Sequence, residues 1–189
     1  MRATYSVRAH SASKKLAFTA LFAALCCVAT VIVVIPLPNG FFNVGDVFVL
    51  LSGWFLGPLY GGIAAAAGSA LADIISGYAI YAPATAIIKG LCAVIAFFLY
   101  KLYKKLIKKG SLDFLPRIFS ALVAEGVMVL GYFLFECALY GVAGAALAVY
   151  GNLLQGACCL GIAVAIGSAL YASPATKKFL SSLQNSKDF

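Results

Sequence analysis

Apolar runs of membrane-spanning length constrain this chain more than any other feature, because a helix of about 20 apolar residues can cross a bilayer. The first run, Leu16 to Ile35, is longer than the core of a signal peptide and no small-residue cleavage site follows it, so we expect it to be retained. The chain is 63% hydrophobic and only 11% charged, whereas a soluble domain carries about 25% charged residues. We therefore predict an all-α integral membrane protein with six transmembrane helices, over residues 16–35, 46–60, 61–77, 82–107, 116–140 and 148–171.

Basic residues sort the connections between these runs into two classes. Of the 14 Lys and Arg residues, all but Lys89 precede the first run, lie at the connection between the fourth and fifth runs or follow the sixth. The connections 36–45, 76–84 and 140–149 contain none. The positive-inside rule then places both termini in the cytoplasm. We predict cytoplasmic tails over 1–15 and 172–189 around a membrane domain of 16–171.

The net charge of +8 is thus a topology signal that also attracts anionic lipid of the bilayer. We expect no nucleic acid among the partners. The protein is predicted to be a multi-pass component of the cell membrane, in a bacterial plasma membrane.

Lys89 lies inside the run 82–107, where a charge is costly unless it is paired or faces a polar cavity. At 1.5 Å per residue, it lies about 10 Å inward from the outer start of that run. Most other polar residues of the runs fall in the same outer half, and pairs three or four apart share a helix face. Amides, carboxylates and aromatic rings converging from several helices favour a pocket for a small, partly aromatic molecule. The predicted pocket residues are Asp46, Asp73, Tyr81, Lys89, Tyr132, Glu136, Asn152 and Gln155.

Two simpler interpretations stay open for parts of this polar layer. Lys89 paired with a carboxylate is alternatively a structural clamp that does not contact a ligand. Tyr78 and Tyr140 are alternatively part of an aromatic belt at the membrane surface.

Catalytic and metal sites find little support in the sequence. The six cysteines lie in apolar runs without a C-x-x-C spacing, and the only histidine, His10, lies in the predicted tail. We predict that the cysteines pack as small apolar residues, that there is no catalytic residue and that the protein needs no metal and no cofactor. The sequence also has no phosphate-binding G-x-x-x-x-G-K-[ST] loop. A small membrane enzyme or a structural scaffold protein remain alternatives of another class, although a scaffold does not need a one-sided polar layer.

Small residues recur at helix-packing spacing. Gly53, Gly57 and Gly61 form two G-x-x-x-G steps, and Ala20 and Ala24 form a similar face in the first run. Such faces let two helices approach closely within a membrane.

Three blocks in order carry a resemblance to a known family: "NVGDVFVLLSGWFLGPLYGGIAAAAGSALADIISGYAIYAPATAIIKG" (43–90), "VMVLGYFLFE" (127–136) and "GNLLQG" (151–156). Over residues 40 to 160, the chain resembles the substrate-binding S component of energy-coupling factor (ECF) vitamin transporters. It is most similar to the branch associated with riboflavin, hydroxymethylpyrimidine and pyridoxine-type vitamins.

The resemblance implies the S-component fold, with six helices, both termini inside and a vitamin pocket near the extracellular face. It also implies partners: a membrane coupling subunit, which docks on the face of Ala20 and Ala24, and two ATPase subunits. The first outer loop, "PLPNGFFNVGD" (36–46), differs from the proline-rich loop of riboflavin-specific members. We therefore favour a one-ring vitamin, with riboflavin as the alternative. The ring of the one-ring vitamin is expected to stack on Tyr132, Phe41 or Phe42.

Overall fold

Helices form almost all of the chain. The computed structural model describes residues 2–36, 41–107 and 114–184, with the backbone alone for 2–11, 181, 182 and 184. The elements are α1 (Arg2–Ile32), β1 (Ile35–Pro36), β2 (Phe41–Phe42), α2 (Gly45–Ile75), α3 (Ala82–Leu106), α4 (Leu115–Ala172) and α5 (Pro174–Gln184). Lys108, Lys109 and Lys187, which contribute to the predicted orientation, lie outside the described residues.

Four helices of the described chain are long and apolar enough to cross a membrane: Ala12–Ile32 of α1, α2, α3 and α4. The prediction of a helical protein with helices of membrane-spanning length is confirmed. The number differs, because the sequence predicts six crossings and the described chain has four such helices. The difference arises because α2 and α4 each contain a glycine with non-helical backbone, Gly57 (φ 86°) and Gly141 (φ 73°). Only glycine adopts such positive φ values without strain, so each helix can change direction there.

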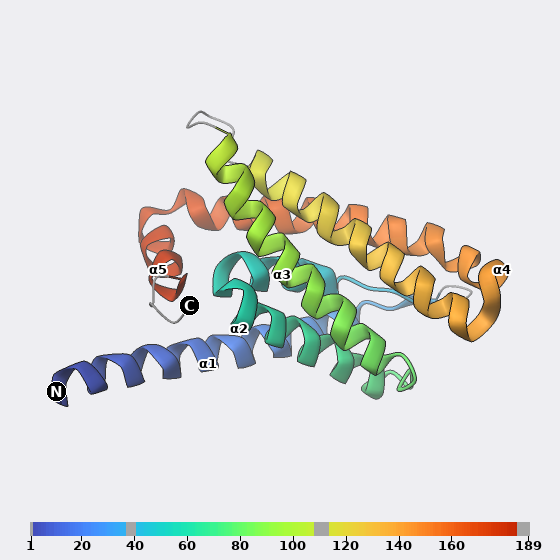
Figure 1. Ribbon diagram of the computed structural model, residues 1–189, viewed down its shortest axis with the longest axis horizontal. Helices are drawn as coiled ribbons and strands as arrows, with labels where there is room; N and C mark the ends of the chain where they lie inside the picture. The colour runs from blue at the N-terminus through green and yellow to red at the C-terminus, as the bar shows by residue number, and fades with distance from the viewer. Residues whose placement is uncertain (1, 37–40, 108–113, 185–189) are drawn as a thin grey trace.

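The 58-residue helix α4 turns back on itself at Gly141. A straight helix of this length would extend about 87 Å, far more than the ~30 Å of bilayer hydrocarbon. Figure 1 shows two arms that run in opposite directions from the turn. They pack closely, since a Cβ added to Gly156 of the second arm would lie 3.1 Å from the Glu125 Cβ of the first.

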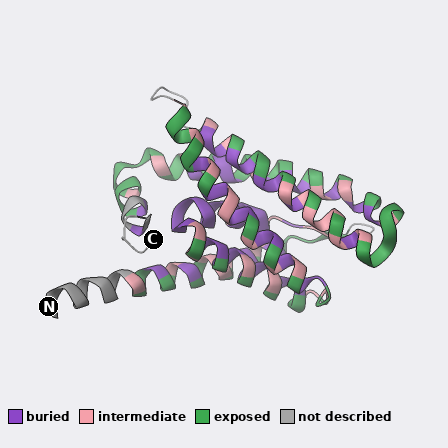
Figure 2. Cartoon of the chain, viewed as in Figure 1, coloured by how far each residue is buried: buried purple, intermediate pink, exposed green. Residues whose placement is uncertain are grey.

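The first arm of α2, residues 45–56, is a core helix. Its residues are buried on nearly every side, and Figure 2 shows this stretch in the middle of the molecule. At about 18 Å it is shorter than the hydrocarbon layer. The second arm starts with Pro58, which suits the first turn of a helix. It folds back so closely that a Cβ at Gly61 would collide with the Ser52 carbonyl.

Glycines also bring α1 and α3 against α2. A Cβ at Gly68 would collide with the Ala23 carbonyl of α1, and one at Gly53 with the Ala93 carbonyl of α3. The predicted small-residue spacing therefore serves packing within the bundle at Gly53 and Gly61, and a change of direction at Gly57. Ala20 and Ala24 lie on an exposed face of α1.

The ends of several elements differ from the prediction. The helix α1 begins at Arg2 and ends at Ile32, so it includes most of the predicted tail 1–15. The predicted tail 172–189 contains α5, an amphipathic helix that packs against α2 and α4. The cytoplasmic location of both tails stays a prediction. The β1–β2 hairpin, with Ile35 paired to Phe42, was not predicted.

Candidate functional site

A pocket opens near the end of the bundle where the β1–β2 hairpin and the α2–α3 connection lie. The empty space in it, open solvent at the mouth included, is about 430 Å³. All the predicted pocket residues except Asp46 line it. The lining residues are Phe41, Asn43, Asp73, Tyr78, Tyr81, Thr85, Lys89, Tyr132, Glu136, Asn152 and Gln155.

Asp46 lies behind the pocket wall and holds two residues that do line it. Its side chain is 2% exposed. Lys89 Nζ donates to Asp46 Oδ1 at 2.5 Å, and Gln155 Nε2 donates to Asp46 Oδ2 at 2.6 Å. Asp46 is the first residue of the predicted run 46–60, so residue number alone puts it at the outer start of that run. The hairpin takes up the outer part of the chain, so α2 begins further inward (Figure 1).

Asn43 connects the hairpin to three helices. Its backbone N–H and its Nδ2 both donate to Gln155 Oε1, at 3.0 and 3.1 Å. Its Oδ1 accepts from the Gly45 N–H at 2.9 Å, a turn that starts α2. The Thr30 hydroxyl of α1 lies 3.5 Å from the same oxygen. Irregular backbone at membrane depth is tolerated where its polar groups are satisfied in this way.

Tyr132 and Thr85 form the wall beside Lys89. Their hydroxyls are hydrogen-bonded at 3.0 Å. Lys89 Nζ lies 5.3 Å from the centre of the Tyr132 ring, a cation–π distance. Lys89 therefore has one carboxylate and one aromatic face as partners, although its side chain also lines the pocket.

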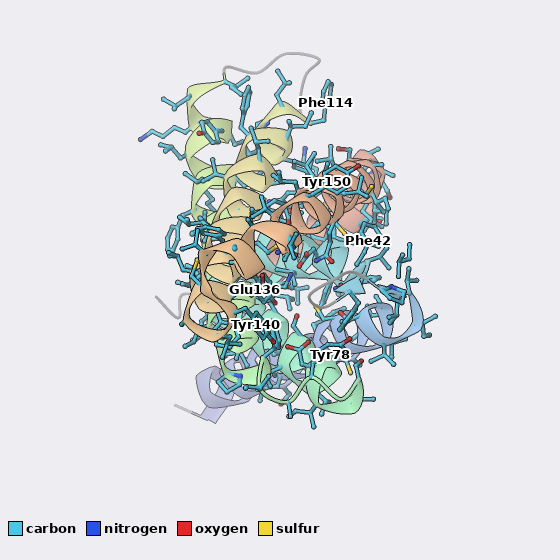
Figure 3. All side chains as sticks on the ribbon, turned by 90° about the vertical axis from the view of Figure 1, so that its right-hand side faces the viewer. Phe42, Tyr78, Phe114, Glu136, Tyr140 and Tyr150 are labelled. Carbon is cyan, nitrogen blue, oxygen red and sulfur yellow. The ribbon has the colours of Figure 1, made fainter. Side chains whose placement is uncertain are left out.

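Phe41, Tyr78 and Tyr81 line the pocket and are called its aromatic mouth here, and Phe135 packs against Tyr81 from outside the lining. The ring centres of Phe41 and Tyr78 lie 5.1 Å apart, those of Tyr78 and Tyr81 6.2 Å, and those of Tyr81 and Phe135 5.3 Å. Figure 3 looks at this end of the molecule, with Glu136 and Tyr140 on α4 and Tyr78 on the α2–α3 connection. Such rings suit the faces of a heterocycle.

The two tyrosines of the possible aromatic belt differ in position. Tyr78 lines the pocket. Tyr140 is 49% exposed, does not line the pocket and approaches Tyr81 with its hydroxyl, at 3.3 Å. The belt interpretation therefore fits Tyr140 better than Tyr78. Burial raises the pKa of Tyr81, so that its phenol keeps its proton and remains a donor.

Sequence reasoning did not identify Asn43 and Thr85 as pocket residues. A signal for Asn43 exists, because an Asn two residues before a Gly at a helix start is typical of a side-chain-capped turn. Thr85 follows Tyr81 by four residues and shares its helix face, so the spacing could have found it.

The cysteines are free in the described chain, and four of the six are buried. Cys92 is an example of the predicted packing role, with its Sγ 3.2 Å from the Ala124 carbonyl. Cys158 is exposed instead. Within the described ranges, no group of three or more His, Cys, Asp or Glu residues is arranged to hold a metal ion.

Comparison with known proteins identifies the family. A model of the family described as "ECF-type riboflavin transporter, S component" matches residues 10–172. A protein of Pyrococcus woesei described as "Uncharacterized protein in gap 3'region" is 37% identical over 130 residues, which are 68% of this chain and 82% of that protein. The family is a membrane transporter component and not an enzyme. The match of the family model, which covers most of the chain, shows that the chain belongs to the S-component family of ECF-type transporters.

Proposed function

We propose that this protein captures a B vitamin or a vitamin precursor at the extracellular face of the cell membrane and delivers it into the cell with an energising module. The observation that carries the proposal is the pocket, where polar and aromatic side chains from β2, α2, α3 and both arms of α4 converge. This composition suits a small heterocycle with hydroxyl or amino groups.

The proposed topology has six crossings with both termini in the cytoplasm of a bacterial cell. The turns at Gly57 and Gly141 divide α2 and α4 into two arms each, which gives six helical segments with α1 and α3. In Figure 1, the start of α1 and the whole of α5 lie at one end of the molecule, and the hairpin and the Gly141 turn at the other. This arrangement agrees with the segregation of basic residues.

A one-ring vitamin such as hydroxymethylpyrimidine or pyridoxine is the favoured ligand, on account of the first outer loop. Riboflavin is the second candidate, because the matching family model is described for riboflavin transporters. Asn152, Gln155 and Glu136 are the proposed hydrogen-bonding contacts. The aromatic mouth is proposed to hold the ring face.

Energy for uptake is proposed to come from a membrane coupling subunit and two ATPases. Ala20 and Ala24 are exposed on α1, and small side chains there let a partner helix approach closely. The chain itself carries no phosphate-binding loop.

Binding of vitamins to the purified full chain tests the function. Riboflavin, hydroxymethylpyrimidine and pyridoxine are added separately, and thermal unfolding in detergent is recorded. One of them should raise the unfolding midpoint and bind with sub-micromolar affinity, about −8 kcal/mol or better. If a wider panel of B vitamins and their precursors also leaves the midpoint unchanged, the proposed function is wrong.

A further inference from the structure

The charges around the pocket do not balance. Among the described residues that line it, the carboxylates are Asp73 and Glu136 and the only Lys or Arg is Lys89. Lys89 is already matched by Asp46 behind the wall, at 2.5 Å. Among the described residues, neither carboxylate of the lining is in ion-pair contact with a Lys or Arg side chain.

Each of these carboxylates also has an oxygen without a partner. Asp73 is 7% exposed and Glu136 is 2% exposed. Asp73 Oδ2 and Glu136 Oε2 are buried and accept no hydrogen bond from any described residue. Leaving buried acceptors unsatisfied is costly, and an ionised carboxylate can only accept. A ligand that brings hydrogen-bond donors would remove this cost.

Both carboxylates lie near hydroxyl groups at the start of α3. The Thr85 hydroxyl interacts electrostatically with Asp73, and the Tyr81 hydroxyl with Glu136. Tyr81 and Thr85 are four residues apart and lie on the same side of α3. Asp73 comes from α2 and Glu136 from α4, so the two acceptors approach one stretch of α3 from different helices.

We infer that the pocket, given its proposed function as a vitamin site, selects a heterocycle with a positively charged, donor-rich edge, which binds Asp73 and Glu136. A protonated ring nitrogen beside an amino or hydroxymethyl group has this chemistry. The aromatic rings of Tyr78 and Tyr81 add favourable contacts for a cationic ring.

The same charges exclude anionic forms of the ligand. A phosphate ester would bring negative charge toward Asp73 and Glu136. Lys89 offers little compensation, because Asp46 and the Tyr132 ring already bind its ammonium group. The site therefore takes the free alcohol and rejects its phosphate ester.

Isothermal titration calorimetry on the purified full chain tests both statements. The probes are pyridoxine, pyridoxine 5′-phosphate, 4-amino-5-hydroxymethyl-2-methylpyrimidine and riboflavin. One of the two one-ring alcohols should bind the unaltered protein, and the phosphate ester should bind at least about 100-fold more weakly than pyridoxine if pyridoxine is that ligand. Asp73→Asn and Glu136→Gln should each weaken binding of the one-ring ligand about 10–100-fold, the value of a hydrogen bond to a charged group.

Glu125→Gln is the matched control. Glu125 is also a buried carboxylate with an unpartnered oxygen, but it does not line the pocket. The affinity of the Glu125→Gln protein for the one-ring ligand should stay within about threefold of that of the unaltered protein, since no ligand contact is lost.

Three results overturn the inference. Tight riboflavin binding that survives Asp73→Asn and Glu136→Gln overturns it and leaves the proposed function intact. Equal affinities for pyridoxine and pyridoxine 5′-phosphate also overturn the inference and leave the proposed function intact. This comparison uses the unaltered protein only. Binding of none of the vitamin probes, nor of a wider vitamin panel, overturns the proposed function together with the inference.

Discussion

Replacing Lys89 by methionine tests whether the buried ion pair is a structural clamp. Met is apolar and of similar length, so the change removes the charge with little loss of volume. Asp46 Oδ1 then loses its partner, while Asp46 Oδ2 keeps the bond from Gln155. The Asp46 carboxylate then stays buried with one hydrogen bond, from Gln155, and without a positive charge beside it.

The expected cost is large. Removing one member of a buried ion pair costs about 3–5 kcal/mol, which at about 2–4 °C per kcal/mol lowers the unfolding midpoint by about 6–20 °C. Adding Asp46→Asn removes the orphaned charge, and Asn can still accept the bond from Gln155. The double variant should therefore recover at least half of the loss.

Thermal unfolding of purified variants in detergent measures this rescue. The control is Lys89→Met with Asp73→Asn, which removes a nearby carboxylate that is not the partner and should rescue nothing. The reasoning is refuted if Asp73→Asn rescues and Asp46→Asn does not, or if Lys89→Met leaves the midpoint unchanged. Vitamin titration of the Lys89→Met/Asp46→Asn protein then decides whether Lys89 also contacts ligand: lost binding in a folded protein means that it does.

Three further variants have distinct expected outcomes. Gly45→Ala should destabilise the protein by about 1–3 kcal/mol in thermal unfolding, because the new methyl group collides with the Thr30 hydroxyl; an unchanged midpoint would contradict the packing described here. Asn152→Ala should weaken vitamin binding by about 1–3 kcal/mol in calorimetry with little change in unfolding; unaltered affinity would remove Asn152 from the site. Ala24→Trp should abolish uptake into cells that contain the energising partners while the isolated protein still binds vitamin. Ile74→Trp, at an exposed position of α2, is its control and should transport normally.

The convergence of the polar layer could be predicted from the sequence. Depth within a helix follows directly from residue number, so charged and amide residues at equal depth in different runs are candidates to meet. This reasoning placed Lys89, Glu136 and Gln155 together, and the structure has all three on one pocket. Their contact with a ligand stays a prediction.

The partner of Lys89 could not be predicted. Three carboxylates lie at a similar depth by residue number: Asp46, Asp73 and Glu136. Which of them pairs with Lys89 depends on the rotation and tilt of the helices, which the sequence does not give. Gly57 and Gly141 are two of 18 glycines, and nothing local distinguishes a glycine that redirects a helix from one that permits close packing. The hairpin explains why α2 starts further inward than predicted. The hairpin itself could not be predicted, because strands of two residues leave no periodic pattern in the sequence.

The ion pair between α2 and α3 has a consequence for biogenesis. Asp46 is synthesised 43 residues before Lys89 and 109 residues before Gln155. A single ionised residue costs up to about 2.5–3.5 kcal/mol during insertion, the value at the centre of a membrane helix, so insertion of α2 and α3 as a pair spares each helix part of that cost. Asp46 acquires its second donor only when the last arm of α4 is in place. Nascent chains that end before this arm should therefore lack a finished pocket.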